Sequence, residues 1–204
     1  MRKNVIRFRQ RDFHLKELDS IDNINWSMEK YGCGPTSLAN VLVNFGYNIN
    51  PNDIARLILF DKDNNFDKTY LRRKGISNDG LLYCLERLKK EKGLDITYNI
   101  VKIDFTNPNI NKNKIINYFK EGYMAIINVG PSEISPLTFS KHGHYLVISY
   151  VDKNNKFYVI NSNKIGDNQT DISYDYDTII KNMYGRKDSF NFLFIIREHA
   201  RKKI

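Results

Sequence analysis

The first half of the chain is a series of helical hydrophobic patterns joined by polar stretches. After the glycine-rich segment 32–34, apolar residues recur at helical spacing until Gly46 ends the run. Further amphipathic helices are predicted to begin near residues 51, 77 and 111. Residues 4–9 alternate in polarity, and residues 96–103 are rich in β-branched and aromatic side chains, so both stretches favour strands. We therefore expect a mainly helical first half.

From Tyr123 onward the pattern changes to short apolar or alternating runs separated by turn residues. Such runs are typical of strands, and they cover residues 124–129, 145–151, 156–160 and 190–196. A short amphipathic stretch around residues 178–184 predicts one helix among them. Because helices come first and strands later, the order predicts an α+β fold with an antiparallel sheet.

The length of the chain fits one domain with a sizeable core. The sequence has 204 residues, 41% of them hydrophobic. We expect one domain over residues 1–204, with a helical half over about 27–122 packed on a sheet half over about 123–197. The chain has no apolar run long enough for a membrane span. As written it would be cytoplasmic, because no apolar segment follows the basic start; it would be secreted if a leader had been removed.

The net charge of +9 could attract anionic partners such as nucleic acid. The lysines and arginines are scattered, however, and the chain has no zinc-finger spacing, RNP-like strand or basic heptad helix. We interpret the charge as solvated surface, and expect no nucleic-acid partner. The sequence does not indicate an oligomeric state.

Cys33 lies between two glycines at the predicted start of a helix, two residues before Pro35. Proline is favoured in a first helical turn, and the unpaired amides and the dipole there stabilise an anion. This position favours the thiolate, which is the form that attacks carbonyls. A lone cysteine is more often a small core residue. The interpretation of Cys33 as a nucleophile therefore depends on a base elsewhere in the chain.

Cys84, the other cysteine, lies on an apolar helical stripe with Leu81, Leu85 and Leu88, and we interpret it as a core residue. The two cysteines could in principle pair. The chain has no CxxC pair that would indicate a metal site. We expect neither a metal nor a cofactor.

His144 immediately precedes the apolar run 145–151. A histidine at the mouth of a buried strand is held by its neighbours while its ring projects past the sheet, which suits a base. His142 and His144 could instead form a metal pair, but the third and fourth ligands are not obvious. A purely structural histidine is the other alternative. His14 and His199 lie in polar surroundings, so His144 is the histidine that we favour as a base.

A partner for His144 follows from the hairpin that the next residues predict. Residues 152–155 are typical of a four-residue turn, so strand 145–151 should fold back on strand 156–162. A centred turn would place His144 opposite position 163, with Asn161 as its diagonal neighbour on the same face. Asn161 could then hold the tautomer of the imidazole. A shift of the turn by one residue would move Asn161 to the opposite face.

Together these residues resemble the papain-like superfamily. The resemblance rests on Gln10 after a short strand, Gly-Cys-Gly-Pro-Thr-Ser at 32–37 opening a helix, Gly-His-Tyr at 143–145 opening a strand, and Asn161 ending the next one. More narrowly, the chain is similar to the bacterial group related to bacteriocin-processing, or double-glycine, peptidases, family thirty-nine among cysteine peptidases. The similarity extends from about residue 5 to residue 196.

The resemblance implies a role for each of four residues. Cys33 corresponds to the nucleophile and His144 to its base. The orienting residue of the family is usually Asp followed by Pro, whereas this chain has Asn161 followed by serine; asparagine serves in papain itself, but it lacks the charge that would stabilise an imidazolium. The glutamine that binds the oxyanion corresponds best to Gln10, since Gln169 comes too late in the order.

The implied reaction is acyl transfer on a peptide or protein substrate. The resemblance implies a papain-like cysteine hydrolase that cleaves a peptide or other amide bond through a Cys-His-Asn triad and a thioester acyl-enzyme. With an amine in place of water, the same residues would make an acyltransferase; a glutamine deamidase would also use this triad. The third possibility is a non-catalytic peptide-binding domain of the same fold. A missing cysteine or histidine would have favoured it, and both are present.

Overall fold

The computed structural model describes residues 5–13, 27–59, 71–72, 75–130, 143–162, 172–184 and 192–197. The chain divides into two compact units, Met1–Leu94 and Asp95–Ile204, which we call the N-terminal and C-terminal units. None of the helices in the described segments is long and apolar enough to cross a membrane.

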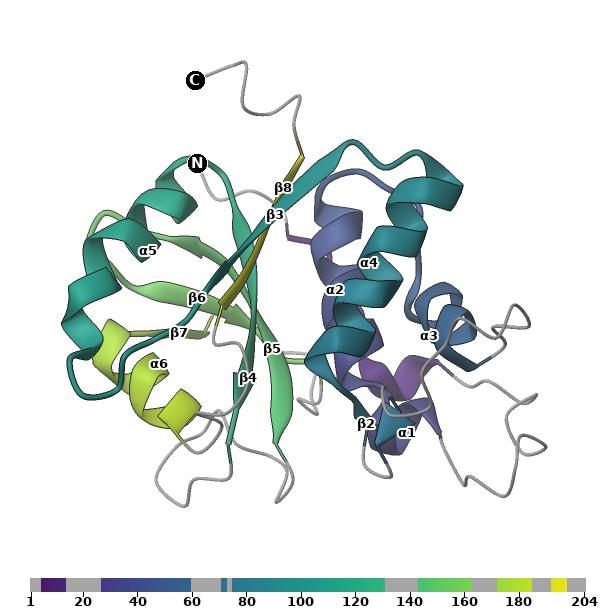
Figure 1. Ribbon diagram of the computed structural model, residues 1–204, viewed down its shortest axis with the longest axis horizontal. Helices are drawn as coiled ribbons and strands as arrows, with labels where there is room; N and C mark the ends of the chain where they lie inside the picture. The colour runs from purple at the N-terminus through teal and green to yellow at the C-terminus, as the bar shows by residue number, and fades with distance from the viewer. Residues whose placement is uncertain are drawn as a thin grey trace. The chain divides into compact units, whose positions relative to one another are not determined.

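The N-terminal unit is mainly helical (Figure 1). Its elements are η1 (Gln10–Asp12), α1 (Met28–Tyr31), α2 (Cys33–Asn44), α3 (Pro51–Leu59), β1 (Leu71–Arg72), β2 (Gly75–Ile76) and α4 (Asn78–Lys92). The strands β1 and β2 form a two-stranded sheet. The α2 helix is buried without interruption from Gly34 to Leu42. The α4 helix begins where the Ser77 side chain accepts a hydrogen bond from the Gly80 amide, and ends at Gly93, whose φ is 61°.

The C-terminal unit is built on a six-stranded antiparallel sheet in the order β3-β8-β4-β5-β6-β7. Its elements are β3 (Ile96–Val101), η4 (Pro108–Asn111), α5 (Lys112–Lys120), β4 (Met124–Val129), β5 (His144–Val151), β6 (Phe157–Ile160), β7 (Ile172–Tyr174), α6 (Tyr176–Met183) and β8 (Phe192–Arg197). Apolar side chains of α5 and α6 form one buried cluster with alternate residues of the strands, so these two helices cover one face of the sheet (Figure 1).

The predicted α+β fold class is confirmed by this helical unit and antiparallel sheet. The two units divide after Leu94, whereas the predicted helical half ended at about residue 122. The reason is that β3 pairs with β8 along its whole length, from Ile96 opposite Arg197 to Val101 opposite Phe192. The short strand β7 had no counterpart among the predicted elements.

The prediction of a strand over residues 4–9 was wrong. The described part, residues 5–9, is assigned to no strand and pairs with none in the described segments. Its backbone instead bonds to side chains of α2, including Asn40 and Asn44. Alternating polarity predicted an extended backbone, but it carries no information on whether the partner is a strand or a helix.

Gly32, which joins α1 to α2, has no room for a side chain. A Cβ atom there would lie 2.5 Å from the carbonyl oxygen of Met28 and 2.7 Å from the Cε atom of the same residue. The Gly32 amide also donates a 2.9 Å hydrogen bond to that carbonyl, so the backbone cannot move apart without losing the bond. Glycine therefore fixes the close approach that starts α2 at Cys33.

We expect Gly32→Ala to lower the free energy of unfolding by about 1–3 kcal/mol, the usual cost of overpacking, as measured by urea unfolding. Gly93→Asn is the control, because nothing lies within 4 Å of the Cβ position there and asparagine tolerates a positive φ. If Gly32→Ala were as stable as the wild type, this steric account of the α1–α2 junction would be wrong.

Candidate active site

Cys33 is the first residue of α2 and is partly accessible, whereas the nine residues that follow it are buried. Gly32 precedes it at the N-cap, and the Thr36 amide donates a 2.9 Å hydrogen bond to the Gly32 carbonyl to open the helix. Pro35 lies in this first turn, where its missing N–H costs no intrahelical bond. Amide groups at a helix start stabilise an anion, so this position favours a thiolate that reagents can reach.

Cys84 has the opposite environment. Its side chain is fully buried within α4, and it forms no disulfide with Cys33. Burial raises the pKa of the Cys84 thiol far above its usual range. The core position predicted for Cys84 is confirmed, and its thiol stays protonated at neutral pH.

Gln10 lies in η1 and is only 1% exposed. Its Nε2 donates a 2.7 Å hydrogen bond to the carbonyl oxygen of Glu29 in α1. In an uninterrupted α-helix that carbonyl would accept from the amide of Cys33, four residues later. The carboxamide of Gln10 therefore lies beside the helical turn that leads into Cys33.

The other polar atom of Gln10 has an unusual environment. Its Oε1 is buried and has no hydrogen-bond partner in the described part of the chain. Rotating the amide would bring Oε1 against the Glu29 carbonyl, so the orientation with Nε2 on that acceptor is the favourable one. An unsatisfied buried acceptor costs about 1–3 kcal/mol. A glutamine kept under such conditions is a candidate functional residue rather than a stabilising one.

His144 is the first residue of β5, and it pairs with Val129 of β4. Gly143 enters the strand with a φ of 94°, a conformation that favours glycine. The histidine is 2% exposed. A base at the mouth of a strand was the prediction, and His144 occupies that position.

The predicted hydrogen bond between His144 and Asn161 is present. Nε2 of His144 lies 3.0 Å from Oδ1 of Asn161, which directly follows β6, and the bond is buried. Because an amide oxygen can only accept, Nε2 carries the proton in this arrangement. In the neutral ring Nδ1 is then the basic nitrogen.

The register that brings these two residues together arises differently from the prediction. The hairpin loop runs from Asp152 to Lys156 and is closed by a 3.0 Å bond from the Asp152 amide to the Lys156 carbonyl. Val151 pairs with Phe157, so the loop is one residue longer than expected. Alone, that change would have moved Asn161 to the opposite face of the sheet.

A β-bulge on β5 restores the register. The pairing shifts by one residue at Ser149, whose hydroxyl donates a 3.1 Å hydrogen bond to the Tyr158 carbonyl. Beyond the bulge Val147 pairs with Ile160, the pairing that a centred turn would have given. The next step places Asn161 on the same face as His144.

Burial lowers the pKa of His144 below its ordinary value of 6.5, and the hydrogen bond with Asn161 opposes that shift. The ring is therefore neutral at pH 7. A neutral imidazole can take a proton, so the electrostatics fit a base.

The metal alternative for His144 has no support in the described residues. No group of three or more His, Cys, Asp or Glu side chains in those segments could hold a metal ion. His142, His14, His199 and Gln169 lie outside the described residues.

The four predicted site residues therefore form two pairs: Gln10 beside the turn before Cys33, and His144 with Asn161. Two groups that hold these residues were not predicted, namely the Glu29 carbonyl and the bulged Ser149. A backbone carbonyl leaves no signal in the sequence, and a serine inside an apolar strand is only a weak indication of a bulge.

A solved structure shares the fold of this chain. A crystal structure from Bacillus anthracis, of a protein named for its likeness to C39 peptidases, superposes with a TM-score of 0.59 at 14% sequence identity. The match covers 95% of this chain and 94% of that one, and at this identity it shows a shared fold. No curated protein matches the chain at a significant level. The sequence pattern of the Peptidase_C39 like family matches residues 2–189, and the chain therefore belongs to that family.

Proposed function

We propose that the protein is a cysteine hydrolase that cleaves a peptide or other amide bond, with Cys33 as nucleophile and His144 as base. The observation that carries the proposal is the buried hydrogen bond from Nε2 of His144 to Asn161. This bond fixes the ring and leaves Nδ1 as the basic nitrogen. A cysteine nucleophile is activated by such a base. Membership of a peptidase family and the partly accessible Cys33 at the start of α2 support the same roles.

In the first half of the proposed reaction, the Cys33 thiol gives its proton to Nδ1 of His144, and the sulfur attacks the carbonyl carbon of the substrate. The carbonyl oxygen becomes an oxyanion. The Cys33 amide and the second Nε2 hydrogen of Gln10 donate hydrogen bonds to it. His144 then passes its proton to the leaving amine, the C–N bond breaks, and a thioester remains on Cys33.

In the second half, water replaces the amine. His144 takes a proton from the water molecule, which attacks the thioester carbonyl, and the thiol leaves with that proton. Asn161 holds the ring through both halves. Because it is neutral, it orients the imidazolium without the charge stabilisation that an aspartate would supply.

An acyltransferase would use the same first half and differ only in the acceptor. A glutamine deamidase would likewise share these residues, with ammonia as the leaving group. A domain that binds peptides without cleaving them would need neither the reactive thiol nor the oriented base. The reactivity of Cys33 therefore separates the catalytic candidates from the binding one.

We expect a limiting dose of iodoacetamide at pH 7 to alkylate Cys33 and spare Cys84, as measured by peptide mass spectrometry. The first thiol is accessible and at a helix start, whereas the second is buried and protonated. His144→Ala should slow the alkylation of Cys33 by at least about tenfold, because the base no longer takes the thiol proton.

Cys84→Ser is the control for this experiment and should leave the labelling of Cys33 unchanged. Equal labelling of both cysteines, with no effect of His144→Ala, would refute the proposed dyad.

We expect Asn161→Asp to raise the pKa of His144 by roughly one to three pH units, because a carboxylate would replace a neutral oxygen 3.0 Å from Nε2. Asn161→Ala should lower that pKa, since the hydrogen bond favours the protonated ring. The measurement is an NMR titration of the His144 ring, assigned with His144→Gln. A pKa that does not respond to Asn161→Asp would mean that the two side chains are not bonded in solution.

A further inference from the structure

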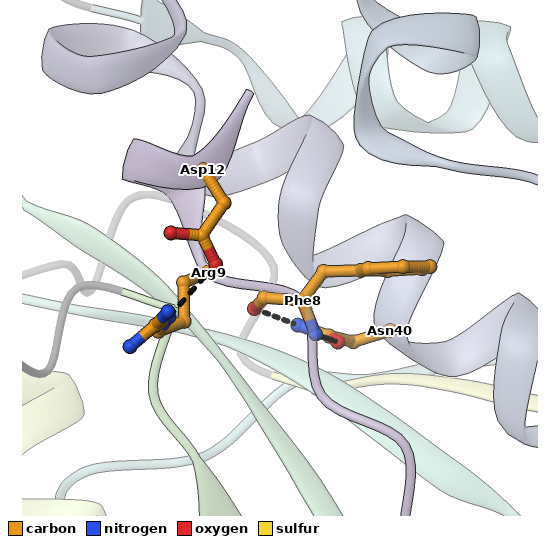
Figure 2. Close-up of polar contacts among 4 residues, drawn as sticks. All are labelled: Phe8, Arg9, Asp12 and Asn40. Carbon is orange, nitrogen blue, oxygen red and sulfur yellow. Dashed lines mark hydrogen bonds and ion pairs between the residues drawn. The ribbon is translucent and has the colours of Figure 1, made fainter. Parts of the chain in front are cut away.

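The N-terminal segment that leads into Gln10 is held by two asparagine side chains of α2. Oδ1 of Asn40 accepts a 2.6 Å hydrogen bond from the Phe8 amide, and its Nδ2 donates a 3.2 Å bond to the Phe8 carbonyl. Asn44 makes the same pair of contacts with Ile6, at 3.0 and 2.8 Å. Figure 2 shows the Asn40 carboxamide against the Phe8 backbone. We call Asn40 and Asn44 the asparagine clamp.

The spacing of the clamp matches the spacing of the segment. Residues two apart in an extended chain are separated by about 6.6 Å, and residues four apart in a helix rise by about 6 Å. Both carboxamides therefore bond to alternate residues of one edge of the segment. A slip of the segment by one residue along α2 would break all four bonds, because the next residue points its polar groups the other way.

The direction of the segment leads Gln10 toward Cys33. Ile6 lies at Asn44 and Phe8 at Asn40, so the segment runs toward the start of the helix. For successive turns of 100° per residue, positions 40 and 44 lie about 20° to either side of position 33, so all three positions lie on one side of α2. The residue that follows along this side, two beyond Phe8, is Gln10.

Local contacts then complete the position of Gln10. The Arg9 side chain forms a 2.8 Å ion pair with Asp12, and the Asp12 amide donates to the Arg9 carbonyl at 3.1 Å, which closes the turn η1 (Figure 2). Phe8 and Phe13 make an edge-to-face ring contact at 5.4 Å across the same turn. The Arg9–Asp12 pair is exposed and contributes little on its own. Asn40, which is 1% exposed, bonds to Phe8 and so ties the residues just before this turn to α2.

We propose that Asn40 is a positioning residue for Gln10: it fixes the N-terminal segment along α2, and so sets where the Gln10 amide meets the oxyanion formed at Cys33. Asn44 extends the same hold by one step. The inference rests on the proposed function, because it matters for catalysis only if Gln10 stabilises an oxyanion. The inference places two groups on one side of α2: the nucleophile Cys33, and Asn40, which positions Gln10 as the donor to the oxyanion.

The test compares two reagents that both react with Cys33. Acetyl-glycyl-glycinal, a peptide aldehyde, forms a hemithioacetal whose oxygen occupies the oxyanion position, whereas alkylation by iodoacetamide forms no oxyanion. Gln10→Ala should weaken inhibition by the aldehyde by about 10²-fold, as expected for one lost oxyanion donor. Asn40→Ala should weaken it by at least about tenfold. Neither change should alter the alkylation rate of Cys33 by more than about twofold.

Two further variants show whether Asn40 acts through Gln10. In Gln10→Ala with Asn40→Ala, the loss should equal that of Gln10→Ala alone, since residues that act as a unit are not additive. Asn44→Ala, at a half-buried site one step farther from Gln10, should give a smaller loss in the same direction. Asn182→Ala is the matched control: it removes a buried asparagine of α6 and should leave aldehyde inhibition unchanged.

A readout without catalysis separates the two claims. The side-chain NH₂ signal of Gln10 should be protected from hydrogen exchange in the wild type and lose that protection in Asn40→Ala. If the wild type is inhibited by the aldehyde but Asn40→Ala changes neither inhibition nor the Gln10 signal, the positioning role is wrong. If Cys33→Ala binds the aldehyde as tightly as the wild type, the proposed function fails, and the inference fails with it.

Discussion

The N-terminal unit depends on one side of α2. Gly32 allows the chain to start the helix in close contact with Met28, which puts Cys33 at the amide-rich end. Asn40 and Asn44, on the same side further along, bond to the backbone of residues 5–9. The α2 helix thus fixes the position of the segment that carries Gln10 relative to the thiol, because a helix is rigid and holds two groups at a fixed separation.

The C-terminal unit depends on strand register in the same way. His144 opens β5, and Asn161 directly follows the neighbouring strand β6. They meet only because the bulge at Ser149 compensates a hairpin loop that is one residue longer than a four-residue turn. Burial keeps the imidazole neutral, and the asparagine fixes which nitrogen is basic. A neutral orienting residue suits this buried site, because an unpaired carboxylate would be costly to bury.

Much of this architecture could be predicted from hydrophobic spacing. The helix from Cys33, the strand that opens at His144 and the α+β order all follow from periodicity and glycine positions. The pairing of His144 with Asn161 was predicted correctly, but the loop length was wrong and the bulge was not foreseen, because two compensating irregularities leave the hydrophobic alternation unchanged.

The asparagine clamp was missed for another reason. Asparagine is a poor helix former, and Asn40 lies in the buried part of α2 while Asn44 is its last residue, which was a usable signal. Their partners, however, are backbone groups that no side-chain pattern reveals.

The central claim is that Cys33 forms a thioester with the help of His144, and trapping that acyl-enzyme tests it most directly. The p-nitrophenyl ester of acetylglycylglycine would be mixed with the protein, quenched in acid and measured by intact and peptide mass spectrometry. We predict one hydroxylamine-labile acyl group per chain, on Cys33, formed at least about 10²-fold more slowly in His144→Ala. Acylation of lysines or Cys84 instead, or an equal rate in His144→Ala, would contradict the account.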